Sequence, residues 1–306
     1  MEVFYADHPC PASYYDDPEL NAVLEQYRQQ LSQTYLSFPV GGLGCLQRLS
    51  RLANGRLLLL SADKGYHRPA DLQGRGKPGV TRHGSVSMTV NYHALAQWVL
   101  HRQGHFFGVP HRRFSVDICA FLLGAPPAAY PETGQAFRLA IEQGGPDDFF
   151  ALKKGVEAHL ASFKAEQLLG WLRLSGWDSK VFLESYPALL NQLTDASDGL
   201  KQEILLAARQ ILAHYYDIGE RVDVPGSLGR LLVQMDCFAE AIDYFQYALW
   251  LRGPKADTLA DIASCHYALR DFESAGACVA QALALDPDCE PARELRHDLR
   301  RLSGES

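Results

Sequence analysis

A set of residues in the last third of the chain recurs after a constant interval of 34 positions. Six pairs keep their size class at this interval: Leu228 and Ile262, Gly229 and Ala263, Phe238 and Phe272, Ala241 and Ala275, Phe245 and Val279, Ala248 and Ala282. Small residues at fixed positions let two helices cross closely, and large residues fill the space beside the crossing. The interval therefore predicts two helical hairpins between about Val224 and Leu302.

This register resembles that of the tetratricopeptide repeat family, in which two antiparallel helices occupy about 34 residues. Pro287 closes the second unit, as the motif of that family requires. The resemblance implies that the first helices, about Gly226 to Gln234 and about Thr258 to Leu269, line a concave surface that binds a protein or peptide. The side chains expected to select this partner are Arg230, Gln234, Asp261, His266 and Arg270. Their mixed charges favour a peptide of both signs over an acidic tail.

A third repeat unit is expected just before these two. Ala207 and Ile211 lie a further 34 positions back, but His214 and Asp195 stand where small residues belong. We expect a degenerate helical pair from about Leu189 to Asp217 that serves as a cap, because a stack of repeats needs about three units to be stable.

The uneven charge divides the chain into two parts. Residues 1–190 carry 18 Lys and Arg against 17 Asp and Glu, whereas residues 191–306 carry 11 against 19. We therefore expect an α/β domain at 1–190, with bridging helices from Pro131 onward, and an all-α tetratricopeptide domain at 191–306. The acidic balance argues against a nucleic-acid partner.

The sequence also bears on the compartment. No apolar run is long enough to span a membrane, and the segment from Met1 to Leu20 lacks the pattern of a secretory signal. The seven cysteines form no CxxC pair and are interpreted as small, buried apolar residues. We expect a cytoplasmic protein that makes no contact with membranes.

The first part alternates between helical and strand patterns. Helical spacing predicts a helix from Asp17 to about Tyr35 and another through Leu43 to Leu52. The apolar run from Leu57 to Leu60 is interpreted as a fully buried strand of a parallel sheet. His105 to Val109 and Phe114 to Leu123 predict an antiparallel hairpin at a sheet edge.

A basic segment follows the apolar strand. Lys64 to Arg113 holds eight Lys and Arg, one acid, Asp71, and six of the eleven histidines. It includes the glycine-rich loop from Gln73 to Gly79. Two interpretations remain open, a solvated loop face and a site for an anionic ligand or an acidic partner.

Short motifs in the first part carry a second resemblance. They are Asp63-Lys64-Gly65-Tyr66 after the apolar run, His83-Gly84-Ser85 followed by Val90-Asn91-Tyr92-His93, and Phe121-Leu122-Leu123-Gly124. Over roughly residues 39–125 the chain resembles the C-terminal half of the MidA-type methyltransferases, which use S-adenosylmethionine. That resemblance implies a partial Rossmann-like sheet with Asp63, His83 and Asn91 as candidate catalytic residues. Lys64 departs from the family, which has Tyr in the middle of this turn.

The cofactor-binding half of such an enzyme is not found in the sequence. Val40-Gly41-Gly42-Leu43-Gly44 is the only glycine cluster near the front, and no strand precedes it, so its backbone amides are not expected to hold a ligand. We therefore expect no cofactor. His101 and His105 have the spacing of a metal pair but lack a third ligand, and we expect no metal.

Two functions remain open. In the first, the chain is an interaction protein in which tetratricopeptide repeats recruit a partner and the methyltransferase-like part is inactive. In the second, it is a protein methyltransferase whose repeats recruit the substrate while Asp63, His83 and Asn91 shape the active site.

Overall fold

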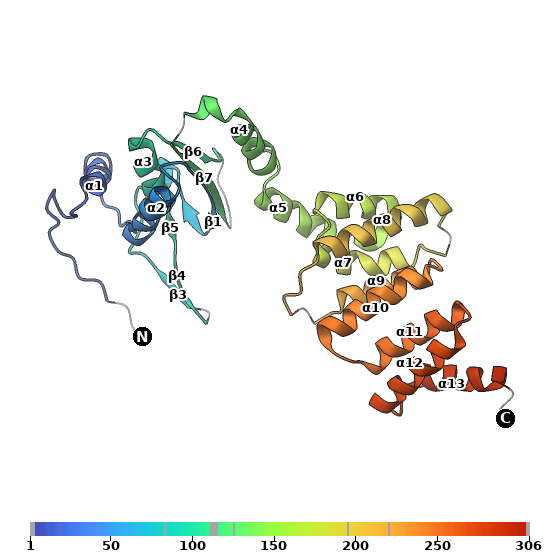
Figure 1. Cartoon of the computed structure of the whole chain (residues 1–306). Coiled ribbons are helices and arrows are strands. Elements are labelled where there is room, and N and C mark those ends of the chain that lie inside the picture. Colours follow the sequence, from blue (N-terminus) through green and yellow to red (C-terminus); the bar gives the residue numbers. More distant parts are fainter. Residues whose placement is uncertain are drawn as a thin grey trace. The chain divides into compact units, whose positions relative to one another are not determined.

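The computed structural model describes residues 4–82, 84–110, 116–124, 126–194, 196–219 and 221–303. The chain divides into two compact units, Met1–Leu152 and Lys153–Ser306. Within the described residues all strands lie in the first unit and the second is helical, as expected (Figure 1). The division lies before the boundary expected at residue 190, so the helices predicted to bridge the two parts belong mostly to the second unit.

The first unit is built around a three-stranded antiparallel sheet. Its strands are β1 (Leu57–Asp63), β6 (His105–Gly108) and β7 (Asp117–Leu123), in the order β1-β7-β6. Leu57 pairs with Leu123 at one end of β1, and Asp63 pairs with Asp117 at the other. The hairpin formed by β6 and β7 confirms the prediction for this segment.

The prediction of a fully buried parallel strand at Leu57 to Leu60 is wrong. β1 is an edge strand that pairs antiparallel with β7, and Leu58 and Leu60 are 45% and 70% exposed. Leu57 and Leu59 pack against the core on the opposite face. The error arose because a short apolar run does not show by itself whether one or both faces of its strand are covered.

Two helices, α2 (Val40–Leu52) and α3 (Tyr92–His101), cover one face of the sheet, and α1 (Pro18–Gln30) packs on α3. Leu43 of α2 and Trp98 of α3 are fully buried in one cluster with Phe121 of β7. Asp17 caps α1 by accepting a hydrogen bond from the amide of Glu19, with proline at the first helical position. α1 ends at Gln30, before the expected Tyr35.

Short elements connect this core. They are β2 (Gly65–Tyr66), η1 (Pro69–Asp71), β3 (Val80–Arg82), β4 (Val86–Met88), β5 (Val90–Asn91) and η2 (Pro127–Ala129). β2 pairs parallel with β5, and β3 pairs antiparallel with β4. The glycine-rich stretch from Gln73 to Gly79 is irregular, as predicted.

Helices follow from Pro131 onward. They are α4 (Pro131–Phe137), the π-helical turn η3 (Arg138–Glu142), α5 (Pro146–Glu157), η4 (Leu160–Ser162), α6 (Ala165–Leu174), α7 (Ser179–Leu190), α8 (Asp198–His214), α9 (Val224–Val233), α10 (Phe238–Arg252), α11 (Ala256–Ala268), α12 (Phe272–Leu285) and α13 (Glu290–Ser303). None of the helices among the described residues combines the length and the apolar character needed to cross a membrane.

The 34-residue interval matches the packing of α9 to α12. α9 packs on α10, α10 on α11, and α11 on α12. Buried residues of the register are Leu228, Gly229, Ala241, Phe245, Ala248, Ile262, Ala263, Ala275, Val279 and Ala282. Five of the six pairs singled out by their spacing are therefore buried in this stack, whereas in the sixth Phe238 is half-buried and Phe272 is exposed.

The expected third helical pair from Leu189 to Asp217 is misplaced. That range holds only the end of α7 and all of α8, and α8 packs on both α6 and α7. Ala207 and Ile211 are buried on α8, in agreement with their register. The connection between α8 and α9 is longer than those between α10 and α11 or α9 and α10, which explains why the interval fails here.

The cysteines are only partly as expected. All seven are unpaired, and Cys119, Cys265 and Cys289 are buried. Cys10 and Cys45 are exposed, so the interpretation of the whole set as buried is wrong.

Candidate functional site

The first helices of the hairpins share one face of the second unit. α7 packs beside α9, and α9 beside α11. Tyr186 of α7 lies close enough to Arg230 and Asp261 for both charges to act on its phenol, whose pKa is raised chiefly by burial. Polar side chains from the three alternate helices α7, α9 and α11 therefore meet on this face.

The five predicted partner-binding residues are distributed over α9, α11 and their ends. The guanidinium of Arg230 donates from Nε to Asp261 Oδ2 at 3.1 Å, so two of the five pair with each other. His266 lies 3.3 Å from the carboxylate of Asp271. Gln234 and Arg270 follow the last residues of α9 and α11 and are exposed, and Arg270 has no ion pair with any residue that the structure describes.

The second helices carry a similar ion pair. Arg209 of α8 contacts Glu240 of α10 with two hydrogen bonds of 2.9 and 2.8 Å. It joins residues 31 positions apart, as Arg230 and Asp261 are. The two pairs offer matched positions on different rows of helices.

The candidate catalytic residues are not assembled into a shared cavity by the residues described. Asp63 is exposed at the end of β1, where its carboxylate accepts a hydrogen bond of 2.7 Å from the amide of Lys64. Asn91 is buried and caps α3: its Oδ1 accepts from the amide of Ala94, and its Nδ2 donates to the carbonyl of Ser37. His83 lies outside the described residues. Asn91 is thus occupied by backbone groups.

His93 is a buried neutral imidazole on α3. Its Nδ1 lies 2.9 Å from the hydroxyl of Tyr27. Burial first, and the nearby His67 second, lower the pKa of His93 to about 4. His93 therefore gains and loses its proton well below neutral pH, whereas an efficient general base at pH 7 has a pKa near 7.

His67, Asp117 and Cys119 form a buried polar cluster that sequence reasoning did not find. His67 Nδ1 lies 2.8 Å from the Asp117 carboxylate, and His67 Nε2 lies 2.9 Å from the carbonyl of Val109. Both ring nitrogens of His67 therefore lie at hydrogen-bond distance from oxygen acceptors. Burial, followed by the charge of Asp117, raises the pKa of the Cys119 thiol.

This cluster has ligand types that metals use, with donor atoms within 4.8 Å of one another. In the arrangement seen here, His67 Nδ1 is at hydrogen-bond distance from the Asp117 carboxylate and His67 Nε2 from the Val109 carbonyl, so both ring nitrogens are engaged by groups of the protein. The cluster is a hydrogen-bonded anchor between the segment after β2 and strand β7. The cluster could not be predicted from sequence spacing, because His67 and Asp117 are 50 positions apart and meet only in the folded chain.

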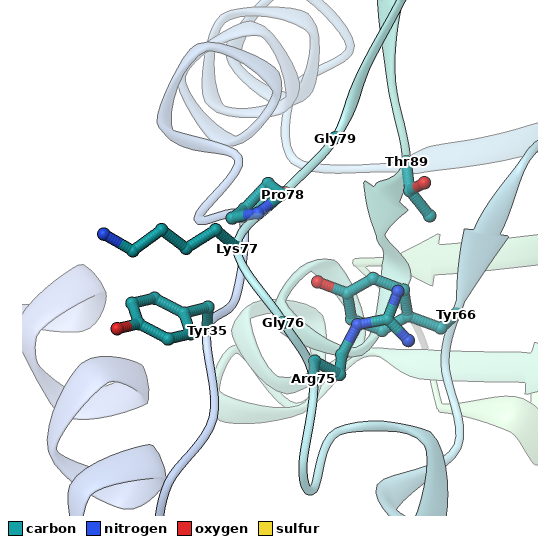
Figure 2. Close-up of a pocket in the computed structure, with 9 residues that line it drawn as sticks. Tyr35, Tyr66, Arg75, Gly76, Lys77, Pro78, Gly79 and Thr89 are labelled. Atoms are coloured by element: carbon teal, nitrogen blue, oxygen red, sulfur yellow. The ribbon is translucent and has the colours of Figure 1, made fainter. Parts of the chain in front are cut away.

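The glycine-rich loop from Gln73 to Gly79, called the basic loop below, lines a cavity of about 330 Å³ in the first unit. Its walls are Tyr35, Ser37, Tyr66, Arg75, Gly76, Lys77, Pro78, Gly79 and Thr89 (Figure 2). Two of these side chains are cationic, four carry hydroxyls, and none is a carboxylate. The loop singled out by its composition is thus folded around a basic cavity.

Arg75 is the best-anchored residue of the cavity. Its guanidinium lies 3.9 Å from the centre of the Tyr66 ring, an arrangement visible in Figure 2. Arg75 Nη1 donates to the carbonyl of Asp71 at 3.0 Å, and its backbone amide donates to Thr34 Oγ1. Burial raises the pKa of Tyr66, with the charge of Arg75 acting in the opposite direction. Arg75 forms no ion pair with a carboxylate in the described part of the chain.

An N-terminal segment lies against the same loop. The Tyr5 hydroxyl donates a hydrogen bond to the carbonyl of Pro78. Asp7 lies 3.4 Å from the ammonium of Lys77, whose Nζ is also 5.5 Å from the centre of the Tyr35 ring. Asp7 is thus the acid that faces Lys77.

No protein-family model matches this chain, and no curated protein matches its sequence. The function must therefore be argued from the arrangement of the residues themselves. Two surfaces offer such an argument, the face shared by α7, α9 and α11, and the basic cavity of the first unit.

Proposed function

We propose that the second unit is a tetratricopeptide-type scaffold that binds a segment of another protein. The observation that carries this proposal is the burial of Gly229, Ala241, Ala263 and Ala275 within the stack of α9 to α12. Small residues in these positions bring the helices close together, and the first helices are left with a polar face for a partner.

The mixed charges on this face favour a partner segment that carries both signs. Arg230 and Asp261 neutralise each other at 3.0 Å, so a ligand meets a paired charge beside the exposed Gln234 and Arg270. A segment with adjacent acidic and basic side chains can exchange partners with this pair, whereas a purely acidic tail must displace Asp261. Arg230 is exposed and Asp261 is half-buried, and ion pairs near the surface contribute little net stability, so such an exchange is energetically accessible.

The test uses the full chain as bait and two matched double variants. Arg230→Ala with His266→Ala alters the first-helix face. Arg209→Ala with His214→Ala removes the same residue types, including an ion pair of the same kind, from α8. Partners are captured by crosslinking to the full chain. We expect a set of proteins that crosslink to the wild type and to the α8 variant but not to the Arg230 and His266 variant, while both variants keep the circular dichroism of the wild type. Equal loss or equal retention by both variants would exclude this face as the binding site.

For the first unit we propose a non-catalytic role, because Asn91 is occupied by capping and Asp63 stands alone at a strand end among the described candidates. Calorimetric titration with S-adenosylmethionine tests this. No saturable heat is expected, and a clear one would favour the methyltransferase alternative.

A further inference from the structure

The basic cavity of the first unit combines three properties of an anion site. Its nine lining residues supply cations and hydroxyl donors and no carboxylate. Its guanidinium is fixed in position by the Tyr66 ring and by the Asp71 carbonyl. Its volume of about 330 Å³ lies at the lower end of the range for small-molecule pockets.

We propose that this cavity binds the phosphate group of a small phosphorylated molecule, with Arg75 as its principal ligand and Lys77 as a second cation. This inference is independent of the function proposed for the helical unit.

Arg75 suits a phosphate for a geometric reason. One guanidinium nitrogen, Nη1, is used by the Asp71 carbonyl, and no hydrogen bond from Nε or Nη2 to a described residue is seen. These two groups form the edge of the planar fork that binds two phosphate oxygens at once. Stacking on Tyr66 holds the fork still, so less side-chain entropy is lost on binding.

The glycines of the loop leave space for the ligand. A Cβ atom at Gly76 or Gly79 would meet no heavy atom within 4 Å, so the backbone at both positions faces open space. The hydroxyls of Ser37 and Thr89 on the cavity wall can donate hydrogen bonds to an oxyanion. Tyr35 on the same wall offers an aromatic ring beside Lys77, against which a flat organic group can lie.

The pairing of Asp7 with Lys77 predicts a competitor within the chain. The carboxylate of Asp7 lies 3.4 Å from the Lys77 ammonium, where it partly neutralises the charge that the phosphate would use. Both side chains are exposed, so this contact is weak enough for a dianion to displace it. Removal of the Asp7 charge is therefore expected to strengthen phosphate binding. If phosphate bound only nonspecifically to a basic surface, removing Asp7 would have no larger effect than removing any other exposed acid.

The experiment titrates the full chain with inorganic phosphate and with phenyl phosphate by calorimetry at low ionic strength. Phenyl phosphate is expected to bind more tightly than inorganic phosphate, since the cavity has room for the ring. Arg75→Gln is expected to weaken binding at least about tenfold, the loss of a charge-assisted contact. Lys77→Gln should weaken it less, and Asp7→Asn should strengthen it by up to about fivefold.

Two further variants keep the test decisive. Lys64→Gln removes a cation from the same basic segment but outside the cavity wall and should leave affinity unchanged. Arg75→Lys keeps the charge and loses the fork, so weaker binding with an unchanged melting temperature separates recognition from folding. If Arg75→Gln does not fold, the affinities of the Lys77→Gln and Asp7→Asn variants, whose changes lie at exposed side chains, test the proposal instead. Absence of saturable binding by the wild type, or equal loss with Lys64→Gln and Lys77→Gln, overturns the proposal.

Discussion

Gly229 of α9 lies directly against the ring of Phe245 on α10: a Cβ atom at Gly229 would lie 2.7 Å from Cε1 of that ring. Phe245 is itself fully buried, so the ring has little room to move. The close approach of α9 and α10 therefore depends on the absence of a side chain at Gly229, and Ala263 occupies the corresponding position one repeat later.

Gly229→Ala should lower the free energy of unfolding by up to about 2 kcal/mol. Alanine gains about 1 kcal/mol in helix propensity, but overpacking of a tight contact costs about 1–3 kcal/mol. Gly276→Ala on α12 is the control, because an added Cβ there meets nothing within 4 Å. That change should stabilise the protein by up to about 1 kcal/mol. Chemical denaturation of both variants measures this, and stabilisation by both would contradict the close contact.

Ala241→Trp and Ala275→Trp should each destabilise the protein by about 1–3 kcal/mol or more, because an indole cannot fit between crossing helices. Both alanines are fully buried. Ala277→Trp on α12 adds the same side chain at an exposed position and should change stability by less than about 0.5 kcal/mol. Similar melting temperatures for the wild type and the two buried variants would mean that the register is wrong.

The 34-residue register of the helices was predictable from sequence because it repeats within one chain. The small size of Ala241 and Ala275 alone indicates where two helices cross closely. β1 was misinterpreted because the pairing of Leu57 with Leu123 depends on contacts between distant residues, which an apolar run does not encode.

The same reasoning limits prediction of the sites. The basic loop was found from its composition, but the cavity depends on Tyr35 and Tyr66, whose rings approach Lys77 and Arg75 only after folding. His67 and Asp117 are partners because β1 pairs antiparallel with β7, and the apolar run of β1 does not encode the direction of that pairing.

Asp117→Ala should destabilise the protein by about 1–3 kcal/mol, because it leaves the buried His67 ring with an unpaired donor. Asp63→Ala is a matched control: Asp63 pairs with Asp117 in the strand register but is exposed, and its loss should cost less than about 1 kcal/mol. In a double variant, His67→Leu should recover part of the loss, since the unpaired donor is gone. Urea denaturation of the set gives the comparison, and equal effects of the two aspartate changes would count against a buried pair.

The last prediction concerns pH and His93. The pKa of His93 is lowered to about 4 in the folded chain, by burial first and then by the nearby His67. An unfolded histidine has a pKa of about 6.5, so between these values the unfolded chain binds a proton that the folded chain does not. The contribution of neutral His93 to stability is therefore complete above about pH 6.5 and decreases as the pH falls towards 4.

From these values the loss between pH 7 and pH 5 is about 2 kcal/mol. His93→Gln removes the titrating group and retains a side chain able to contact the Tyr27 hydroxyl, which lies 2.9 Å from His93 Nδ1. Urea denaturation of both proteins at the two pH values isolates the effect, because the other titrating groups are common to them. The wild type should lose about 2 kcal/mol more than the variant on going to pH 5. Equal losses of unfolding free energy in the two proteins would show that His93 binds its proton as readily in the folded chain as in the unfolded one. His93 would then not be a buried neutral imidazole near pH 5.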